Sequence, residues 1–387
     1  MLYRYPHYYG LFTCVADRCI DSCCSGWQIV IDDEALEAYK NYEGEYRRTL
    51  HENIDWQEGA FCHGTDGMCA FLRDDLLCDM YAHMGKDCLC KTCREYPRHT
   101  EEFENVRDIS LSLSCPEVAR IVMNMTEKVT FVEREDDSLE EYDDFDDFLY
   151  FILCDMRDEI ISILQDRELD IESRIRTMLM LSESAQRHLE EGSLVMWSQT
   201  GEDDLPGSEK APGACYESGA KDKTGISDEP KAGNEPEAFD RYELLKRQFS
   251  FLREGLELLY DDWDEVLMES EAVLFSGSST FEARLCEFTS WWQGSSLMPL
   301  DIVLEQVLVY FVYIYLPGAV YDGNIKGKLD SAAGHGVELF LLFMARWLIN
   351  GGQLDVTELV ELVYRYSREI EHSDFNLEAV ENFEWYR

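Results

Sequence analysis

Apolar residues recur at helical spacing through most of the chain after residue 115. Residues 148–164 alternate apolar and charged side chains with the period of a helix, and residues 177–190 are rich in helix formers. Residues 300–316 and 336–349 are apolar on nearly every face, which predicts buried helices. Strands and helices do not alternate in the pattern that builds a parallel sheet. We therefore predict a mainly α protein that ends in a helical bundle.

Shorter elements are expected nearer the start of the chain. Asp32 to Tyr46 is predicted to be a helix with Asp32 or Asp33 as its N-cap. Pro116 to Met125 is also predicted to be helical, with proline at the first position. Gln28 to Ile31 fits either a strand or the start of a helix. This part of the chain is predicted to consist of short, irregular elements.

Composition suggests where the domains begin and end. Residues 133–147 hold ten acidic residues and one arginine, which indicates a solvated connection or a helix start. The segment after residue 200 is dominated by small and charged residues, which is typical of disorder. Apolar stripes resume at 245–266 and 354–370. We divide the chain into a cysteine-rich domain at 1–125, a helical region at 126–200, a disordered linker at 201–238 and a helical domain at 239–387.

The charge of the chain narrows its possible partners. It has 79 acidic and 34 basic residues and a net charge of -45. Nucleic acids and anionic membranes both select basic surfaces, so neither is expected as a partner. An acidic surface would attract a partner that presents lysines, although a solvated surface that keeps the protein soluble explains most of the excess.

No run of about 18 uncharged apolar residues, the minimum for a membrane-spanning helix, is evident. Val307 to Val320 comes nearest, and Pro317 interrupts it. The first residues, MLYRYPHYYGLFTC, lack the pattern of a signal peptide. We therefore expect a cytoplasmic protein. Disulfides are rare in that compartment, so clustered cysteines there indicate metal binding or catalysis.

Eleven of the 14 cysteines lie between Cys14 and Cys115. They gather in CVADRCIDSCC, in CAFLRDDLLC and in CLCKTC, and the set ends with a cysteine followed by proline. Cysteines acting only as small buried residues would not crowd in this way. Thiolate is a soft ligand, so the pattern predicts a site for zinc or for an iron–sulfur cluster.

The irregular spacing of the cysteines favours the cluster over zinc. Structural zinc usually takes paired CxxC-type knuckles, whereas a cubane accepts thiolates at less regular spacing. The neighbours Cys23 and Cys24 are awkward ligands for one ion, because we expect their side chains to diverge toward different centres. The surplus over four ligands indicates two centres or some spectator thiols. The spacing does not match the CxxxCxxC triad of radical enzymes that use S-adenosylmethionine.

Five sequence blocks together resemble the flagellin lysine-N-methylase (FliB) family, with an N-terminal module similar to small zinc- or iron-chelating proteins. The blocks are CVADRCIDSCCSGWQIVID, CKTCREYPR, SLSLSCPEVAR, YLPGAVYDG and RYSREIEHSDFNLE. They extend from the N-terminus to near the C-terminus, with the linker excepted.

The resemblance implies an activity and its cofactors. Proteins of this family transfer methyl groups from S-adenosylmethionine to lysine side chains of flagellin, and their N-terminal cysteines hold a 4Fe–4S cluster. The metal ligands implied for this chain are Cys14, Cys19, Cys23, Cys24, Cys69, Cys78, Cys93 and Cys115. Cys62, Cys88 and Cys90 look like additions of this sequence and are left out.

Methyl transfer to lysine requires a neutral amine, because an ammonium group has no lone pair. In RYSREIEHSDFNLE, His372 can titrate near neutral pH, and Glu371 or Asp374 can orient it, so these three are predicted as catalytic. Arg368 and Asp322 are predicted to bind the cofactor. The alternative is that Arg368 and Glu371 form an exposed i,i+3 pair beside a histidine at a helix end.

No GxGxxG fingerprint follows a predicted strand, so the cofactor pocket is not expected to be the usual doubly wound one. An open iron of the cluster could instead bind the amino and carboxylate groups of S-adenosylmethionine. Two other functions stay open: a non-enzymatic zinc or iron–sulfur module fused to a helical interaction domain, and a thiol redox protein. Methyl incorporation into flagellin would distinguish the enzyme from both.

Overall fold

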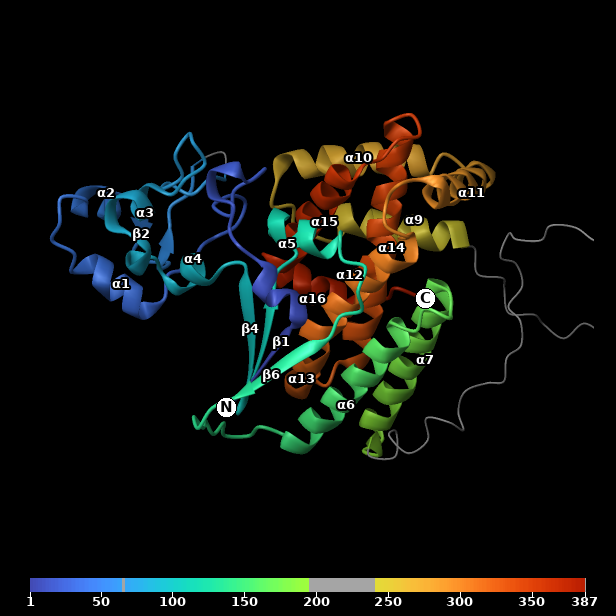
Figure 1. Ribbon diagram of the computed structural model, residues 1–387, viewed down its shortest axis with the longest axis horizontal. Helices are drawn as coiled ribbons and strands as arrows, with labels where there is room; N and C mark the ends of the chain where they lie inside the picture. The colour runs from blue at the N-terminus through green and yellow to red at the C-terminus, as the bar shows by residue number, and fades with distance from the viewer. Residues whose placement is uncertain (65–66, 195–240, 387) are drawn as a thin grey trace, which may run out of the picture.

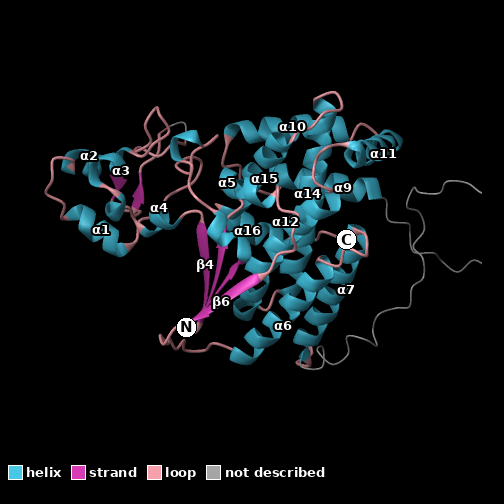
Figure 2. Cartoon of the chain, in the orientation of Figure 1, coloured by secondary structure: helices cyan, strands magenta, loops and turns pink. Residues whose placement is uncertain are grey.

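The computed structural model describes residues 1–64, 67–194 and 241–386. The linker predicted at 201–238 lies outside these residues, as does Cys215. The chain forms two bodies side by side (Figures 1 and 2). The cysteine-rich body comprises residues 14–95, and the helical body comprises the rest of the described chain. This arrangement confirms the predicted mainly α protein with an irregular cysteine-rich module.

Helices make up most of the helical body. They are α5 (Pro116–Val122), α6 (Asp147–Leu164), α7 (Ile171–Glu190), α9 (Arg241–Glu254), α10 (Asp261–Leu274), α11 (Ser278–Gly294), α12 (Leu300–Tyr315), α13 (Ala319–Asp322), α14 (Ile325–Ile349), α15 (Val356–Glu371) and α16 (Asp374–Asn382). Helices α12 and α14 are buried on nearly all sides, as their apolar sequences predict. The apolar stripe at 245–266 is divided between α9 and α10 by a loop at 255–260.

A four-stranded sheet, which the sequence pattern does not predict, covers one side of this body. Its strand order is β4-β5-β1-β6, formed by Arg98–Phe103, Val106–Leu111, Leu2–Pro6 and Phe131–Glu135. Strand β1 pairs parallel with β5 and antiparallel with β6. The strands are short and come from distant parts of the chain, so no local strand–helix alternation reveals them. Strand β6 includes the first residues of the acidic run at 133–147. Asp146, near the end of that run, is the N-cap of α6.

The sheet determines how the first residues pack. Tyr8 and Phe12 join the same apolar core as Leu111, Val118 and the bundle helices. The predicted domain at 1–125 therefore contributes to both bodies: residues 1–13 and 96–125 pack with the helices, and the segment between them has its own small core.

The cysteine-rich body contains short elements. These are α1 (Asp33–Lys40), α2 (Arg47–Glu52), α3 (Asp79–Met84), α4 (Lys91–Glu95) and the paired strands β2 (Ile54–Asp55) and β3 (Ala60–Phe61). Asp32 is the N-cap of α1, as predicted, and accepts a hydrogen bond from the backbone of Ala35. The helix ends at Lys40, short of the predicted Tyr46. The segment predicted as strand or helix start at 28–31 is extended, and Val30 forms one β-bridge with Ala60.

Two helical segments are long and apolar enough to cross a membrane by length and composition, contrary to the sequence expectation. They are Leu300–Asp322 and Ile325–Ile349, and 83% and 72% of their most apolar windows are buried inside the protein. Both carry buried charges: Glu305 pairs with Arg174 at 2.9 Å, and Lys328 pairs with Glu381 at 2.8 Å. Burial and ion pairs of this kind are typical of core helices in a globular protein. The cytoplasmic location stays a prediction.

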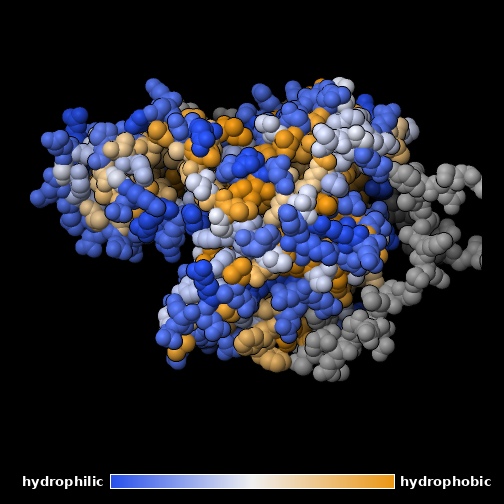
Figure 3. Space-filling model, in the orientation of Figure 1, coloured by the Kyte–Doolittle hydropathy of each residue, from blue (hydrophilic) through white to orange (hydrophobic). Residues whose placement is uncertain are grey.

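Figure 3 shows a mostly hydrophilic surface on the face in view, in keeping with the net charge of -45. Hydrophobic atoms gather over α5, close to the place where the two bodies meet. This junction is where the sequence-predicted site residues on α15 contact the cysteine-bearing loops.

Candidate functional site

Arg368, near the end of α15, joins three segments that are far apart in the sequence. Its Nε donates to the carbonyl oxygen of Ser114 at 2.8 Å, and its Nη1 donates to Asp21 Oδ2 at 2.6 Å. Nη1 also lies 3.2 Å from the hydroxyl of Tyr260. Only 1% of Arg368 is exposed, so the alternative of an exposed pair with Glu371 is wrong.

Helix α15, which carries Arg368 and Glu371, begins at a well-defined N-cap. Asp355 and Glu358 form a capping box, in which each side chain accepts a hydrogen bond from the backbone N–H of the other residue. The buried face of the helix then places Arg368 and Glu371 three residues apart, toward the segment at 112–115. The Arg368 guanidinium also lies 5.0 Å from the ring centre of Tyr364, one turn earlier.

Tyr260, from the loop before α10, fastens the cysteine-bearing loop at 19–27 to the helical body. Its hydroxyl donates to the carbonyl oxygen of Ser25 at 2.7 Å. Gly26 has a φ of +80°, and a Cβ there would lie 2.1 Å from Tyr260 Cζ. Only glycine satisfies both conditions, which explains the glycine in the CCSGW part of the first block.

Glu371 lies in a network of hydroxyl groups. Tyr310 donates to Glu371 Oε2 at 2.6 Å, Ser112 donates to the same oxygen at 3.3 Å, and Ser367 donates to Oε1. Burial raises the pKa of Glu371, and the hydrogen bonds from Ser367 and Tyr310 oppose that shift. The result is a carboxyl group whose proton affinity exceeds that of an exposed glutamate.

His372 belongs to the same network but differs in its titration. Its Nε2 lies 3.0 Å from Ser114 Oγ, and its ring centre is 4.5 Å from that of Trp27. Burial, followed by the charge of Arg368, lowers the pKa of His372 to about 3. The imidazole is therefore neutral at physiological pH. Within the described residues, its buried Nδ1 has no hydrogen-bond partner.

The remaining predicted residues lie outside this network. Asp374 is exposed in the first turn of α16. Asp322 ends α13, which packs against α6 and lies away from the cysteine-rich body (Figure 1). Its carboxylate accepts from the backbone of Asn324 at 2.8 Å and pairs with Lys328 at 2.9 Å. The structure thus separates Asp322 from Arg368, the other residue predicted to bind the cofactor.

One set of thiols lies beside Arg368. Burial raises the pKa of Cys19, the nearby Arg368 charge lowers it, and Cys23 and Cys14 raise it further. Burial also raises the pKa of Cys115 to about 12, with contributions from Cys19 and Cys23. These four cysteines were all predicted as metal ligands, and the fold brings their charges within range of one another.

A second set of thiols lies deeper in the cysteine-rich body. Burial raises the pKa of Cys69 to about 11, and Cys78 adds to the shift. The Cys90 and Cys93 thiols share a hydrogen bond, which lowers the pKa of Cys90 and raises that of Cys93. Cys90 therefore belongs with Cys93, although the family pattern omits it. The CxxC spacing of these two residues is the sequence signal that identifies the pair.

Cys23 and Cys24 connect the two sets of thiols. Their side chains do not diverge as expected, because a hydrogen bond joins the two thiols. This hydrogen bond is the main cause of the raised pKa of Cys23. Residues 23 and 24 form a turn, in which neighbouring side chains are not forced to opposite sides as they are on a strand.

The thiols fit some metal groups better than others. Among residues 1–64, 67–194 and 241–386, no group of three or more His, Cys, Asp or Glu side chains is arranged to hold one metal ion. Thiolates around one zinc ion, each at about 2.3 Å, must crowd within about 4 Å of one another, whereas each thiolate of a cubane binds its own iron. The donors of the first set are soft thiols, and the nearby Arg368 has a buried Nη2 without a hydrogen-bond partner in the described residues. This chemistry would suit an anionic polynuclear cluster better than a single zinc ion.

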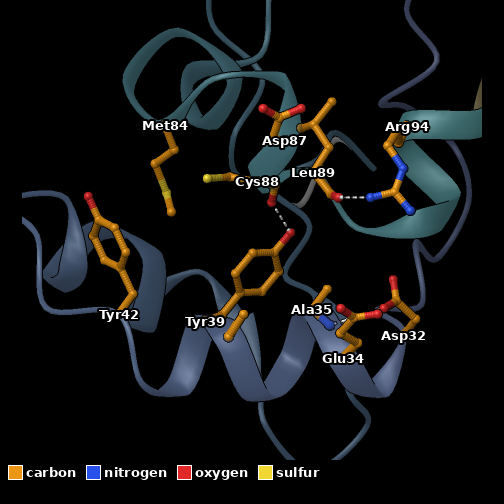
Figure 4. A pocket seen from close by; sticks show the side chains of 11 residues that line it. Asp32, Glu34, Ala35, Tyr39, Tyr42, Met84, Asp87, Cys88, Leu89 and Arg94 are labelled. Atoms are coloured by element: carbon orange, nitrogen blue, oxygen red, sulfur yellow. Dashed lines mark hydrogen bonds between the residues drawn. The ribbon is translucent and has the colours of Figure 1, made fainter.

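A pocket of about 200 Å³ lies elsewhere, between α1 and the segment at 84–94 (Figure 4). Tyr39 lies along one side of it, and its hydroxyl donates to the carbonyl oxygen of Cys88 at 2.6 Å. The Asp32 carboxylate already accepts hydrogen bonds from the backbone N–H groups of Ala35 and Lys91. None of the predicted site residues lines this pocket, so we do not assign the chemistry to it.

Comparisons with known proteins identify the helical part of the chain. The family model described as the FliB lysine N-methylase C-terminal domain matches residues 157–384. This range contains Tyr260, Tyr310, Arg368 and Glu371 but none of the cysteines near Arg368. No solved structure matches the chain.

Three curated relatives from Salmonella are each 29% identical to parts of the chain. "Flagellar biosynthetic protein FliU" of Salmonella muenchen aligns over 139 residues, which is 34% of this chain and 82% of the relative. Proteins named "Lysine-N-methylase" in Salmonella typhimurium and Salmonella choleraesuis align over 138 residues, 33% of this chain and 34% of their own length. The alignment thus spans about a third of those two relatives. Because the family model covers more than half of the chain, this protein belongs to the FliB lysine N-methylase family.

Proposed function

We propose that this protein transfers methyl groups from S-adenosylmethionine to lysine side chains of flagellin. Membership of a lysine N-methylase family supports lysine as the acceptor, and the name of the flagellar relative supports a flagellar substrate. The net charge of -45 suits a protein partner that presents lysines. The observation that carries the proposal is the meeting of Arg368, Glu371 and the cysteine-bearing loops at one place in a chain of this family.

Glu371 is the best proton acceptor for the lysine ammonium. A base must be ionised and yet hold its proton strongly enough to take it from the amine, and the raised pKa of Glu371 meets this need. His372 is a weaker base because its pKa is about 3. We assign His372 the role of orienting Ser114 within the hydroxyl network. A catalytic role for Asp374 stays a prediction.

We propose that Cys19, Cys23 and Cys115 hold an iron–sulfur cluster at this site. The mutual influence of their charges and the soft chemistry of thiolates support this choice. With one iron free of thiolate, the cluster would supply a Lewis acid for the amino and carboxylate groups of S-adenosylmethionine. Arg368 keeps the cysteine-bearing segments together through its bonds to Asp21 and Ser114.

The test is methyl incorporation into flagellin from labelled S-adenosylmethionine, with anaerobically purified full-length protein. Glu371→Gln keeps the shape of the side chain and removes its charge, so we expect kcat to fall by roughly 10²–10⁴-fold. The matched control is Glu378→Gln, an exposed carboxylate on α16, for which we expect kcat within about twofold of wild type. Wild-type protein that holds iron and sulfide but methylates no lysine would favour the non-enzymatic metal module with a helical interaction domain.

A further inference from the structure

The buried guanidinium of Arg368 has an unused donor. Its Nε and Nη1 are hydrogen-bonded, but within the described residues Nη2 is buried without a partner. A buried donor on a charged group is costly to leave unpaired, so such groups are normally satisfied by protein, water or a ligand. The position of this unpaired donor therefore indicates where a bound group would lie.

The partners of Arg368 all neighbour cysteines. Asp21 lies between Cys19 and Cys23 in the sequence, and Ser114 directly precedes Cys115. The Tyr260 hydroxyl, which accepts from Arg368, donates to Ser25, the residue after Cys24. One guanidinium is thus linked to the two chain segments that supply Cys19, Cys23 and Cys115.

Arg368 forms one ion pair within the described residues. Asp21 is its ion-pair partner at 2.6 Å, and 27% of that side chain is exposed. Cationic side chains near sulfur ligands stabilise the extra negative charge that a cluster gains on reduction.

We propose that Arg368 is a positioning residue that donates from Nη2 to the sulfur-rich anionic group held by Cys19, Cys23 and Cys115. The helical body thereby contributes directly to the environment of a group whose ligands come from the cysteine-bearing segments. The proposal rests on the iron–sulfur part of the proposed function. It differs from a purely structural link between the two bodies, because it predicts that Arg368 changes the electronic properties of the bound group.

The experiment measures iron, sulfide and the midpoint potential of full-length protein purified without oxygen. For Arg368→Gln we expect the equilibrium constant for reduction to fall roughly tenfold, equivalent to about 59 mV for one electron. The potential becomes more negative because the added electron loses a nearby positive charge. For Asp21→Asn, which removes a negative charge and leaves Arg368 in place, we expect a shift of similar size in the opposite direction.

Arg365→Gln is the matched control. Arg365 lies three residues earlier on α15 and pairs with Asp262 at 2.8 Å and with Glu361 at 3.4 Å, so we expect its loss to leave the potential nearly unchanged. If Arg368→Gln does not fold, Arg368→Lys and Asp21→Asn provide the test: lysine keeps the charge, so a potential near that of wild type is expected.

The possible outcomes separate this proposal from the proposed function. Iron-loaded Arg368→Gln or Asp21→Asn with the potential and spectrum of wild type would overturn the role of Arg368 and leave methylation standing. Wild-type protein that methylates lysine with zinc alone, or with no metal, would overturn both the cluster and this proposal. Opposite shifts in the two variants, with an unchanged control, would establish it.

Discussion

Glu369 makes the stability of the helical body depend on pH. The residue is 3% exposed, its Oε2 accepts from the backbone of Leu259 at 2.8 Å, and within the described residues its Oε1 has no partner. Burial raises its pKa from the ordinary 4.5 to about 7, against the opposing effect of backbone N–H groups and Arg365. An acid whose pKa is higher in the folded state binds its proton more tightly there, so stability is lost as pH rises from about 4.5 to about 7.

The size of this loss follows from the two pKa values. At about 1.4 kcal/mol per pH unit, ionisation of Glu369 costs about 3 kcal/mol of folding free energy above pH 7. Glu369→Gln keeps an acceptor for Leu259 and cannot ionise. We therefore expect the variant to gain about 1 kcal/mol over wild type at about pH 5.5 and about 3 kcal/mol at about pH 8.5.

Urea unfolding of the two proteins at these two pH values measures the effect. The informative quantity is the increase in the stability difference between about pH 5.5 and about pH 8.5, expected to be about 2 kcal/mol. Glu378→Gln, an exposed carboxylate on the neighbouring helix, should show almost no such increase. A difference for Glu369→Gln that is the same at both pH values would refute the burial argument.

Three further predictions follow from the packing and titration of individual residues. The rate of methylation should fall as pH drops through the raised pKa of Glu371, because only the ionised carboxyl accepts a proton. A pH–rate profile without this decrease at low pH would contradict the assignment of Glu371 as the base. Gly26→Ala should lower the free energy of unfolding by more than about 1–2 kcal/mol, because alanine strains the positive φ and displaces the Tyr260 ring. Tyr260→Phe loses only one hydrogen bond and should lower it by about 1 kcal/mol, and thermal unfolding of the two variants compares these losses. Glu305→Gln removes the nearer and fully buried of the two acidic partners of Arg174, leaving only the half-exposed Asp301 at 3.9 Å. We expect this change to lower the free energy of unfolding in urea by about 3–5 kcal/mol, and a loss below about 1 kcal/mol would indicate that Asp301 or another acceptor replaces Glu305.

Local patterns were sufficient to predict several of the longer helices and the presence of a cysteine-rich module. The periodicity of residues 148–164 and 354–370 predicts α6 and α15, because a helix buries one stripe of its own sequence and needs no distant partner for that pattern to be visible. Asp32 was identified as a cap for the same reason, since the bond that it accepts comes from a residue three positions away. The crowding of cysteines is likewise a local property of the sequence.

Only the tertiary structure decided which distant segments meet. Strand β1 pairs with residues 106–108 and 131–135, and no local signal specifies those partners. Arg368 and Glu371 fit an exposed i,i+3 pair in the sequence, yet Arg368 is buried and Glu371 half-buried, and both contact segments more than a hundred residues away on the chain. Burial is a property of the assembled fold, and it is burial that raises the pKa of Glu371 and lowers that of His372. The sequence by itself therefore determined the helices with a clear apolar stripe and the kind of chemistry to expect, whereas the three-dimensional packing determined which residues share a site and how each of them titrates.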